Sequence, residues 1–275
     1  MKKIIALLLA LVMVFALCAC GKTKTEEQPQ TEEPETEEVV VEEPTTEEPA
    51  TEEPATEEPA TEEPAAEGVM TYAEFDAAEM DTEVTVETYV QAHQSWWDGK
   101  VTVYTQTPDG AYFLYNMACS EEDAAKLVPG QKIRVTGFKS EWAGEVEITD
   151  ATFEFVDGDT WIAEPVDITA DWGTVDMIAH QNQLVSFKGV TVEAYDESGA
   201  AFVYKNAEEK TDDLYFKVTI GDTTYEFCVE YYLCGSDTDV YKAVENLQVG
   251  DVIDLEGFLY WYEGPNLHTT AVIVK

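Results

Sequence analysis

Residues 127–144 read LVPGQKIRVTGFKSEWAG, and residues 247–264 read LQVGDVIDLEGFLYWYEG. The two stretches share Leu, Gly, Ile, Gly, Phe and Gly at equivalent places, each pair 120 residues apart with no gap. Short-period repeat proteins have units of about 20–50 residues, well below this spacing. The stretch therefore predicts two copies of one domain.

Strand patterns surround the first copy of the stretch. Apolar and polar residues alternate in short runs, which is typical of half-buried strands. Ser120 begins a short acidic segment with the pattern of a helix N-terminus, and Pro129-Gly130 ends it. Gly137 suits a strand that bends sharply. The expected strands are residues 84–89, 101–105, 112–115, 132–138 and 146–155, with a helix at residues 120–127.

The second copy repeats this pattern with one addition. A polar and turn-rich stretch separates its first two strands and has no counterpart in the first copy. Inserted loops on a repeated scaffold are places where function often differs. The expected strands are residues 184–192, 215–220, 224–233, 252–258 and 269–274, with a helix at residues 236–247.

In both copies the order is three strands, a short helix and two strands. This order resembles the OB-fold, a five-stranded, partly open Greek-key barrel. The resemblance implies an all-β chain with short helices, built as two tandem five-stranded OB-like barrels. The expected domains are residues 68–156 and 157–275, the second with an inserted hairpin near residues 194–213. A related small β-barrel is the alternative.

The N-terminus has the features of an export signal. Met1-Lys2-Lys3 is basic, and residues 4–16 are apolar but too few to span a bilayer comfortably. The segment Leu17-Cys18-Ala19-Cys20 resembles the lipobox of bacterial lipoproteins. The resemblance implies that residues 1–19 form a signal peptide and that Cys20 carries acyl chains such as palmitate. Those chains would anchor the exported protein to the outer face of the cell membrane. A plain secretory signal is the alternative.

A repetitive acidic segment follows the signal. Four copies of Thr-Glu-Glu-Pro-Ala run from Thr46 to Ala65, after degenerate versions of the same unit. A segment with so few large apolar residues cannot bury a core, so we expect residues 20–67 to be a disordered stalk. Regular proline and dense like charge favour an extended chain. The predicted role is a spacer between the membrane and the folded domains.

The chain is strongly acidic, with a net charge of −42. Residues 1–67 hold 18 of the 57 acidic residues and 4 of the 15 basic residues. Residues 68–275 therefore hold 39 acidic and 11 basic residues, a net charge of −28. Affinity for phosphate backbones comes mainly from Lys and Arg, so this charge predicts against nucleic acid as a partner. It favours cations or a basic partner.

Aromatic residues are the candidate binding residues. OB-folds bind oligonucleotides and oligosaccharides on the face of strands two and three and through the loops between strands one and two and between strands four and five. Exposed rings in such loops would stack on a ligand. The alternative is that the rings close the barrel ends. The candidates are Trp96, Trp97, Tyr104, Tyr112, Tyr115, Trp142, Trp261 and Tyr262.

The sequence offers no pattern for catalysis or for a cofactor. Cys119, Cys228 and Cys234 are an odd number in the folded part and are expected to be buried thiols rather than a disulfide framework. No histidine stands at a spacing that would activate them. Zinc, EF-hand, P-loop and dinucleotide patterns are absent. We therefore expect no enzyme activity, no metal and no cofactor.

These observations favour a lipid-anchored, cell-surface binding protein. Its partners would be the membrane, through the lipid on Cys20, and a glycan or a protein held by the barrels. Two other functions stay open. One is single-stranded nucleic-acid binding, which uses the same fold, and the other is an accessory subunit of an envelope enzyme or transporter.

Overall fold

The computed structural model describes residues 68–206 and 211–275, which belong to one compact unit. The signal peptide, the lipidated Cys20 and the stalk predicted for residues 1–67 lie outside the described residues. Among the described residues, no helix is both long and apolar enough to cross a membrane.

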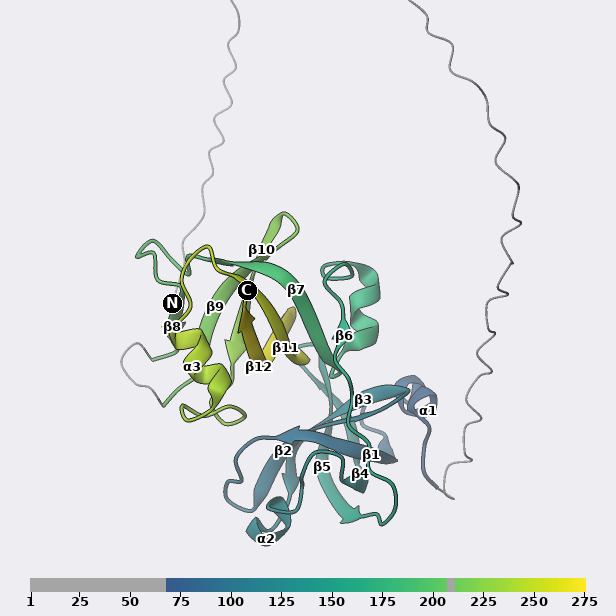
Figure 1. The fold of residues 1–275 in the computed structure, drawn as a ribbon. Coiled ribbons are helices and arrows are strands. Elements are labelled where there is room, and N and C mark those ends of the chain that lie inside the picture. The colour runs from purple at the N-terminus through teal and green to yellow at the C-terminus, as the bar shows by residue number, and fades with distance from the viewer. Residues whose placement is uncertain (1–67, 207–210) are drawn as a thin grey trace, which may run out of the picture. The chain divides into compact units, whose positions relative to one another are not determined.

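The first five strands close into a barrel with the order β1-β2-β3-β5-β4 (Figure 1). Neighbouring strands pair antiparallel, except that β3 and β5 pair parallel. A short helix, α2, lies between β3 and β4, and another, α1, precedes β1. The bounds are α1 Tyr72–Ala77, β1 Glu83–His93, β2 Lys100–Thr107, β3 Gly110–Ala118, α2 Glu121–Ala124, β4 Lys132–Trp142 and β5 Glu145–Phe155.

The second barrel has the same topology. Its sheet order is β6-β7-β11-β12-β10-β9-β8, and a further pairing of β7 with β9 closes the five inner strands. β10 and β12 pair parallel, as β3 and β5 do. The bounds are β6 Val166–Asp167, the 3-10 helix η1 Val175–His180, β7 Leu184–Glu193, β8 Phe202–Tyr204, β9 Leu214–Ile220, β10 Thr223–Val229, α3 Asp239–Glu245, β11 Val252–Trp261 and β12 Pro265–Val274.

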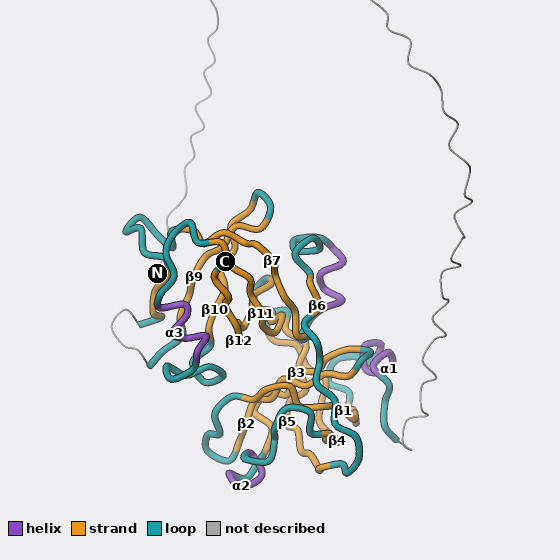
Figure 2. The backbone as a smooth tube through the Cα atoms, in the orientation of Figure 1, coloured by secondary structure: helices purple, strands orange, loops and turns teal. Residues whose placement is uncertain are grey.

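The prediction of an all-β chain with two five-stranded OB-like barrels is confirmed. Strands dominate both barrels and the helices are short (Figure 2). The repeated stretch supplies the fourth strand of each barrel, β4 and β11, together with the turn before it. Its apolar positions face inward because alternate residues of a strand point to one side. Leu127, Ile133 and Ile253 are among the buried core residues.

Two details differ from the sequence prediction. β10 ends at Val229, four residues before the predicted end, because Glu230 accepts the backbone N–H of Leu233 and turns the chain. The inserted segment contributes one short strand, β8, which pairs antiparallel with β9 rather than with another inserted strand. The insertion therefore widens the sheet of the second barrel beside β9.

One glycine in each copy of the repeat lies where two backbones nearly touch. A Cβ on Gly137 would lie 2.7 Å from the Thr149 carbonyl oxygen, and a Cβ on Gly257 would lie 2.4 Å from the carbonyl oxygen of His268. The strand register shifts beside both glycines. Such irregularities bend a strand, and a bend is required for a small barrel to close.

The barrels contact each other through aromatic rings. Tyr104 of β2 stacks on Phe258 of β11, with ring centroids 4.4 Å apart and planes 21° apart. The Tyr104 hydroxyl and His268 Nδ1 form a hydrogen bond of 2.6 Å. Phe113 completes this small cluster, which is separate from the core of either barrel. The contact buries apolar rings from both barrels and so couples their stability.

Polar groups also join the barrels. The backbone N–H of Trp261 donates to Glu145 Oε2 over 2.7 Å, and Gln181 Nε2 donates to the Gly144 carbonyl oxygen over 2.9 Å. Glu145 is fully buried, and burial raises the pKa of its carboxyl to about 8, although the Trp261 N–H favours the ionised form. The carboxyl is therefore largely protonated at neutral pH.

Glu145→Gln is expected to flatten the pH dependence of folding stability. The carboxyl has a pKa of about 8 in the folded protein and an ordinary value of 4.5, so between these values the folded state binds a proton that the unfolded chain lacks. Stability should fall as pH rises through this window, by up to ~1.4 kcal/mol per pH unit for one proton. Urea unfolding at several pH values measures the slope. The same slope in Glu145→Gln and the parent would contradict the assignment.

Candidate ligand-binding site

Of the eight predicted aromatic residues, two are buried, Tyr104 and Tyr112, and two are partly buried against a core, Trp96 and Trp261. Tyr104 is covered by the second barrel, and Tyr112 packs edge-on against Phe75 of α1. Trp96 donates its indole N–H to the Cys119 carbonyl oxygen and packs on the first core, and Trp261 packs on the second core. These four rings pack against the barrels, which is the alternative that the sequence left open.

The other four predicted residues are exposed. Trp97 is 78% exposed, although its neighbour Trp96 is packed. Trp142 and Tyr262 are about half exposed and pack on each other, with ring centroids 5.1 Å apart. Tyr115 is exposed on β3. Large exposed rings that gather in one region mark an interaction surface.

Trp97 and Tyr115 line a cleft of about 350 Å³, here called the aromatic cleft. The loop between β1 and β2 forms one wall, and β2 and β3 form the floor. Tyr232 of the second barrel adds a third ring, and its carbonyl oxygen accepts the backbone N–H of Ser95 over 2.7 Å. The lining residues are Gln94, Ser95, Trp97, Lys100, Val101, Thr102, Tyr115, Asn116 and Tyr232.

The aromatic cleft has no carboxylate among its lining residues, although the protein is strongly acidic. Lys100 is its charged side chain, and amides and hydroxyls supply the other polar groups. The Thr102 hydroxyl accepts the backbone N–H of Asn116, which holds both residues at the cleft floor. The cleft therefore offers rings for stacking and neutral groups for hydrogen bonding, with one positive charge.

A smaller hollow of about 120 Å³ adjoins the aromatic cleft, because Tyr115 lines both. Its other walls are Trp142 and Glu147 of the first barrel and Tyr260 of the second. Burial raises the pKa of the Glu147 carboxyl to about 7. Exposed aromatic residues thus continue from the first barrel to the second.

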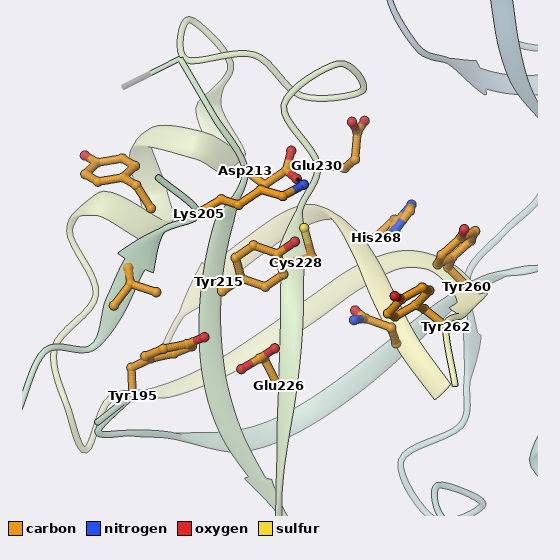
Figure 3. Close-up of a pocket in the computed structure, with 13 residues that line it drawn as sticks. Tyr195, Lys205, Asp213, Tyr215, Glu226, Cys228, Glu230, Tyr260, Tyr262 and His268 are labelled. Atoms are coloured by element: carbon orange, nitrogen blue, oxygen red, sulfur yellow. Dashed lines mark hydrogen bonds and ion pairs between the residues drawn. The ribbon is translucent and has the colours of Figure 1, made fainter. Parts of the chain in front are cut away.

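A larger pocket of about 430 Å³ lies in the second barrel and is called here the tyrosine pocket (Figure 3). The inserted segment, β9, β10 and the β11–β12 hairpin all contribute to it. Tyr260 lines both this pocket and the small hollow. The lining residues are Tyr195, Val203, Tyr204, Lys205, Asp213, Tyr215, Glu226, Cys228, Glu230, Tyr260, Tyr262, Asn266 and His268.

Several residues of these sites escaped the sequence prediction. Lys100 and Tyr232 complete the aromatic cleft, and neither belongs to an aromatic loop pattern. Tyr195 and Lys205 stand in the insertion, whose presence was the available signal that the second barrel has a site of its own. Tyr232 could not be found from sequence, because it reaches the cleft only through the contact between barrels.

The three cysteines of the folded part are free and buried, as predicted. Burial raises the pKa of the Cys119 thiol to about 11 and that of Cys234 to about 12, so neither is a thiolate at neutral pH. The described residues hold no group of three or more His, Cys, Asp or Glu side chains placed to bind a metal ion.

No protein-family model and no curated protein matches the chain. Among solved structures, a murine DNA-binding protein bound to double-stranded DNA matches 70% of this chain and 96% of its own, at 13% identity and a TM-score of 0.33. The p204 HINb domain matches 72% of this chain and 100% of its own, at 12% identity and a TM-score of 0.33. A replication protein A heterotrimer bound to single-stranded DNA matches 73% of this chain and 51% of its own, at 11% identity and a TM-score of 0.29. The likeness concerns the fold.

The prediction that nucleic acid is an unlikely partner is corrected: it conflicts with the descriptions of three of the matching structures, which have DNA bound. The prediction used net charge, which sums over the whole surface. Binding takes place at one face, and the aromatic cleft carries Lys100 without a lining carboxylate. Net charge alone therefore does not decide the ligand class.

Proposed function

We propose that the protein is a non-enzymatic binding protein that holds an oligosaccharide in the aromatic cleft. The observation that carries the proposal is the cleft of about 350 Å³ in which Trp97, Tyr115 and Tyr232 face one opening. The cleft lies on the strand two and three face, beside the loop between strands one and two, where OB-folds hold their ligands.

The polar lining favours a sugar as the ligand. A sugar ring has an apolar face that stacks on aromatic rings and a rim of hydroxyls that need hydrogen-bond partners. Gln94, Ser95, Thr102 and Asn116 supply amide and hydroxyl groups around the exposed rings. Small-molecule sites commonly combine apolar rings with a few such polar groups.

A single-stranded oligonucleotide is the second candidate ligand. The specific observation in its favour is Lys100, which stands beside Trp97 in a cleft lined by no carboxylate. Bases stack on aromatic rings irrespective of sequence, and a lysine attracts the phosphates. The proposed place of action, for either ligand, is the outer surface of the cell membrane, through lipid on Cys20.

Trp97→Ala is expected to weaken ligand binding about 10- to 100-fold, because stacking on one ring contributes about 1–3 kcal/mol. A glycan array identifies the ligand, and calorimetric titration of the full chain measures the dissociation constant. Tyr115→Ala should weaken binding in the same way. Trp161→Ala is the matched control, since Trp161 packs on Tyr89 and does not line the cleft.

Three outcomes are distinguishable. Weaker glycan binding in Trp97→Ala and Tyr115→Ala, with Trp161→Ala unchanged, supports the proposal. If the protein retains oligo(dT) at low salt and binds no glycan, a single-stranded oligonucleotide replaces the oligosaccharide as the proposed ligand. Glycan binding that is the same in all three variants and the parent contradicts the cleft as the site.

A further inference from the structure

The tyrosine pocket differs chemically from the aromatic cleft. Five tyrosines and three carboxylates line it, and Lys205 is its one basic side chain besides the imidazole of His268 (Figure 3). The aromatic cleft has no lining carboxylate and so selects a different kind of ligand. The ligand of this pocket does not depend on the ligand proposed for the cleft.

The lysine of the tyrosine pocket is already neutralised. Lys205 Nζ lies 3.0 Å from Asp213 Oδ2, and Asp213 also accepts the backbone N–H of Tyr231. Burial lowers the pKa of the His268 imidazole to about 4, so this ring is neutral at physiological pH. Glu226 lies opposite Lys217 of β9 in the strand register, so Glu230 is the lining carboxylate that no positive side chain of the pocket balances.

Glu230 is one of the three carboxylates that line the tyrosine pocket. It lies in the turn after β10, where the backbone N–H of Leu233 donates to its Oε2 over 2.7 Å. No described residue forms an ion pair with it. Burial, and then the charge of Asp213, raises the pKa of its carboxyl to about 7. A partly buried carboxylate of this kind is stabilised by a cation brought close to it.

Glu226 stands on β10 beside the ring of Tyr195, which belongs to the inserted segment. Lys217 lies near this wall, with its Nζ 4.6 Å from the Tyr195 ring centroid, and donates to the Tyr195 carbonyl oxygen. This wall thus already has one cation over an aromatic ring. Faces of tyrosine attract cations, and they do so more strongly where water is excluded.

We infer that the tyrosine pocket binds an organic cation, a protonated amine on a small body that packs against the tyrosine rings. The negative charge of Glu226 and Glu230 attracts the ammonium group, and Tyr215, Tyr260 and Tyr262 provide aromatic walls. The volume of about 430 Å³ accommodates a small ligand. The described side chains do not form a metal-binding group, which favours an organic cation over a bare metal ion.

The inserted segment makes this pocket specific to the second barrel. Residues 194–213 have no counterpart in the first barrel. They supply Tyr195 and Lys205 to the pocket, and also Asp213, the residue before β9. The same fold therefore carries an aromatic cleft without a lining carboxylate in one copy and an acidic aromatic pocket in the other. Duplication followed by insertion separates the two ligand chemistries.

The test is a calorimetric titration of the full chain with cadaverine and, in parallel, with 1,5-pentanediol. The two probes have the same carbon chain, and only cadaverine is cationic. Saturable binding of cadaverine with no binding of the diol is expected. Glu230→Gln should weaken cadaverine binding about tenfold or more, and Glu226→Gln serves as the second variant if Glu230→Gln does not fold.

An acidic protein attracts cations everywhere, so the control is Glu121→Gln. Glu121 is an exposed residue of α2 in the first barrel, and its substitution changes the net charge by the same amount. Equal affinities for cadaverine and the diol would overturn the inference. The inference would also be overturned if Glu230→Gln and Glu226→Gln lost no more cadaverine affinity than Glu121→Gln.

The pH dependence gives a second measurement. Cadaverine affinity should rise as pH rises through about 7, because Glu230 must ionise to attract the ammonium group. Six ionisable groups face Glu230: Asp213, Lys205, Cys228, Cys234, Tyr104 and Tyr260. Burial raises the pKa of the two thiols and the two phenols, so those four groups stay neutral. Glu147, in the adjoining hollow, ionises over the same range. Glu230→Gln should reduce the rise, and an unchanged rise would exclude Glu230.

Discussion

Phe258→Ala should destabilise the folded protein by about 3–5 kcal/mol, as expected for loss of a buried phenylalanine. Phe258 is 3% exposed and stacks on Tyr104 of the other barrel. Its removal leaves a cavity between the barrels rather than within either core. We expect the parent to unfold in one transition, because the contact couples the barrels, and Phe258→Ala to unfold in two, one for each barrel. Differential scanning calorimetry measures both effects.

Phe187→Ala is the control for this prediction. Phe187 is fully buried in the core of the second barrel, so its loss should be as costly but should act on that barrel directly. The barrels stabilise each other if Phe258→Ala unfolds in two transitions and its first barrel is less stable than that of Phe187→Ala. One transition at the parent temperature would mean that the aromatic contact contributes little.

Gly257→Ala is expected to cost about 2–3 kcal/mol or more, because added atoms in a tightly packed site force the backbone to move. The new Cβ would lie 2.4 Å from the His268 carbonyl oxygen and 2.9 Å from the carbonyl carbon. Both are backbone atoms of β12, which cannot swing aside as a side chain can. Urea unfolding of the variant measures the loss.

Two other glycines of the repeat make this prediction specific. Gly137→Ala, at the equivalent place in the first barrel, should also destabilise, since its Cβ would lie 2.7 Å from the Thr149 carbonyl oxygen. Gly264→Ala should be nearly neutral, because no heavy atom lies within 4 Å of its added Cβ. Equal stabilities for Gly257→Ala and Gly264→Ala would contradict the steric argument.

The topology could be predicted because it depends on local patterns. Alternation marked the strands, and Ser120 begins the first barrel's helix as predicted. The helix of the second barrel begins at Thr238, two residues after the predicted Ser236. The 120-residue repeat then required both halves to share one fold. Strand ends were less predictable, as at Val229, because a turn formed by a side chain such as Glu230 competes with strand extension.

The exposure of individual rings could not be predicted from these patterns. Trp96 and Trp97 are adjacent in one loop, but only Trp97 projects into solvent. Tyr104 and Tyr115 lie on neighbouring strands, and the second barrel covers Tyr104 and leaves Tyr115 open. In each case burial depends on residues more than 20 positions away in sequence, such as Cys119 and Phe258. A local pattern does not record such contacts.

The repeat, the two OB-like barrels and the buried glycines and aliphatic residues that form them follow from local sequence patterns, because alternation and turn chemistry act over a few residues. The tertiary structure alone decided which aromatic rings are free. It also brought Tyr232 to the aromatic cleft and assembled Tyr195, Glu230 and Tyr260 around one pocket. The physical reason is that a binding site depends on packing between distant segments, and here on the contact between the two barrels.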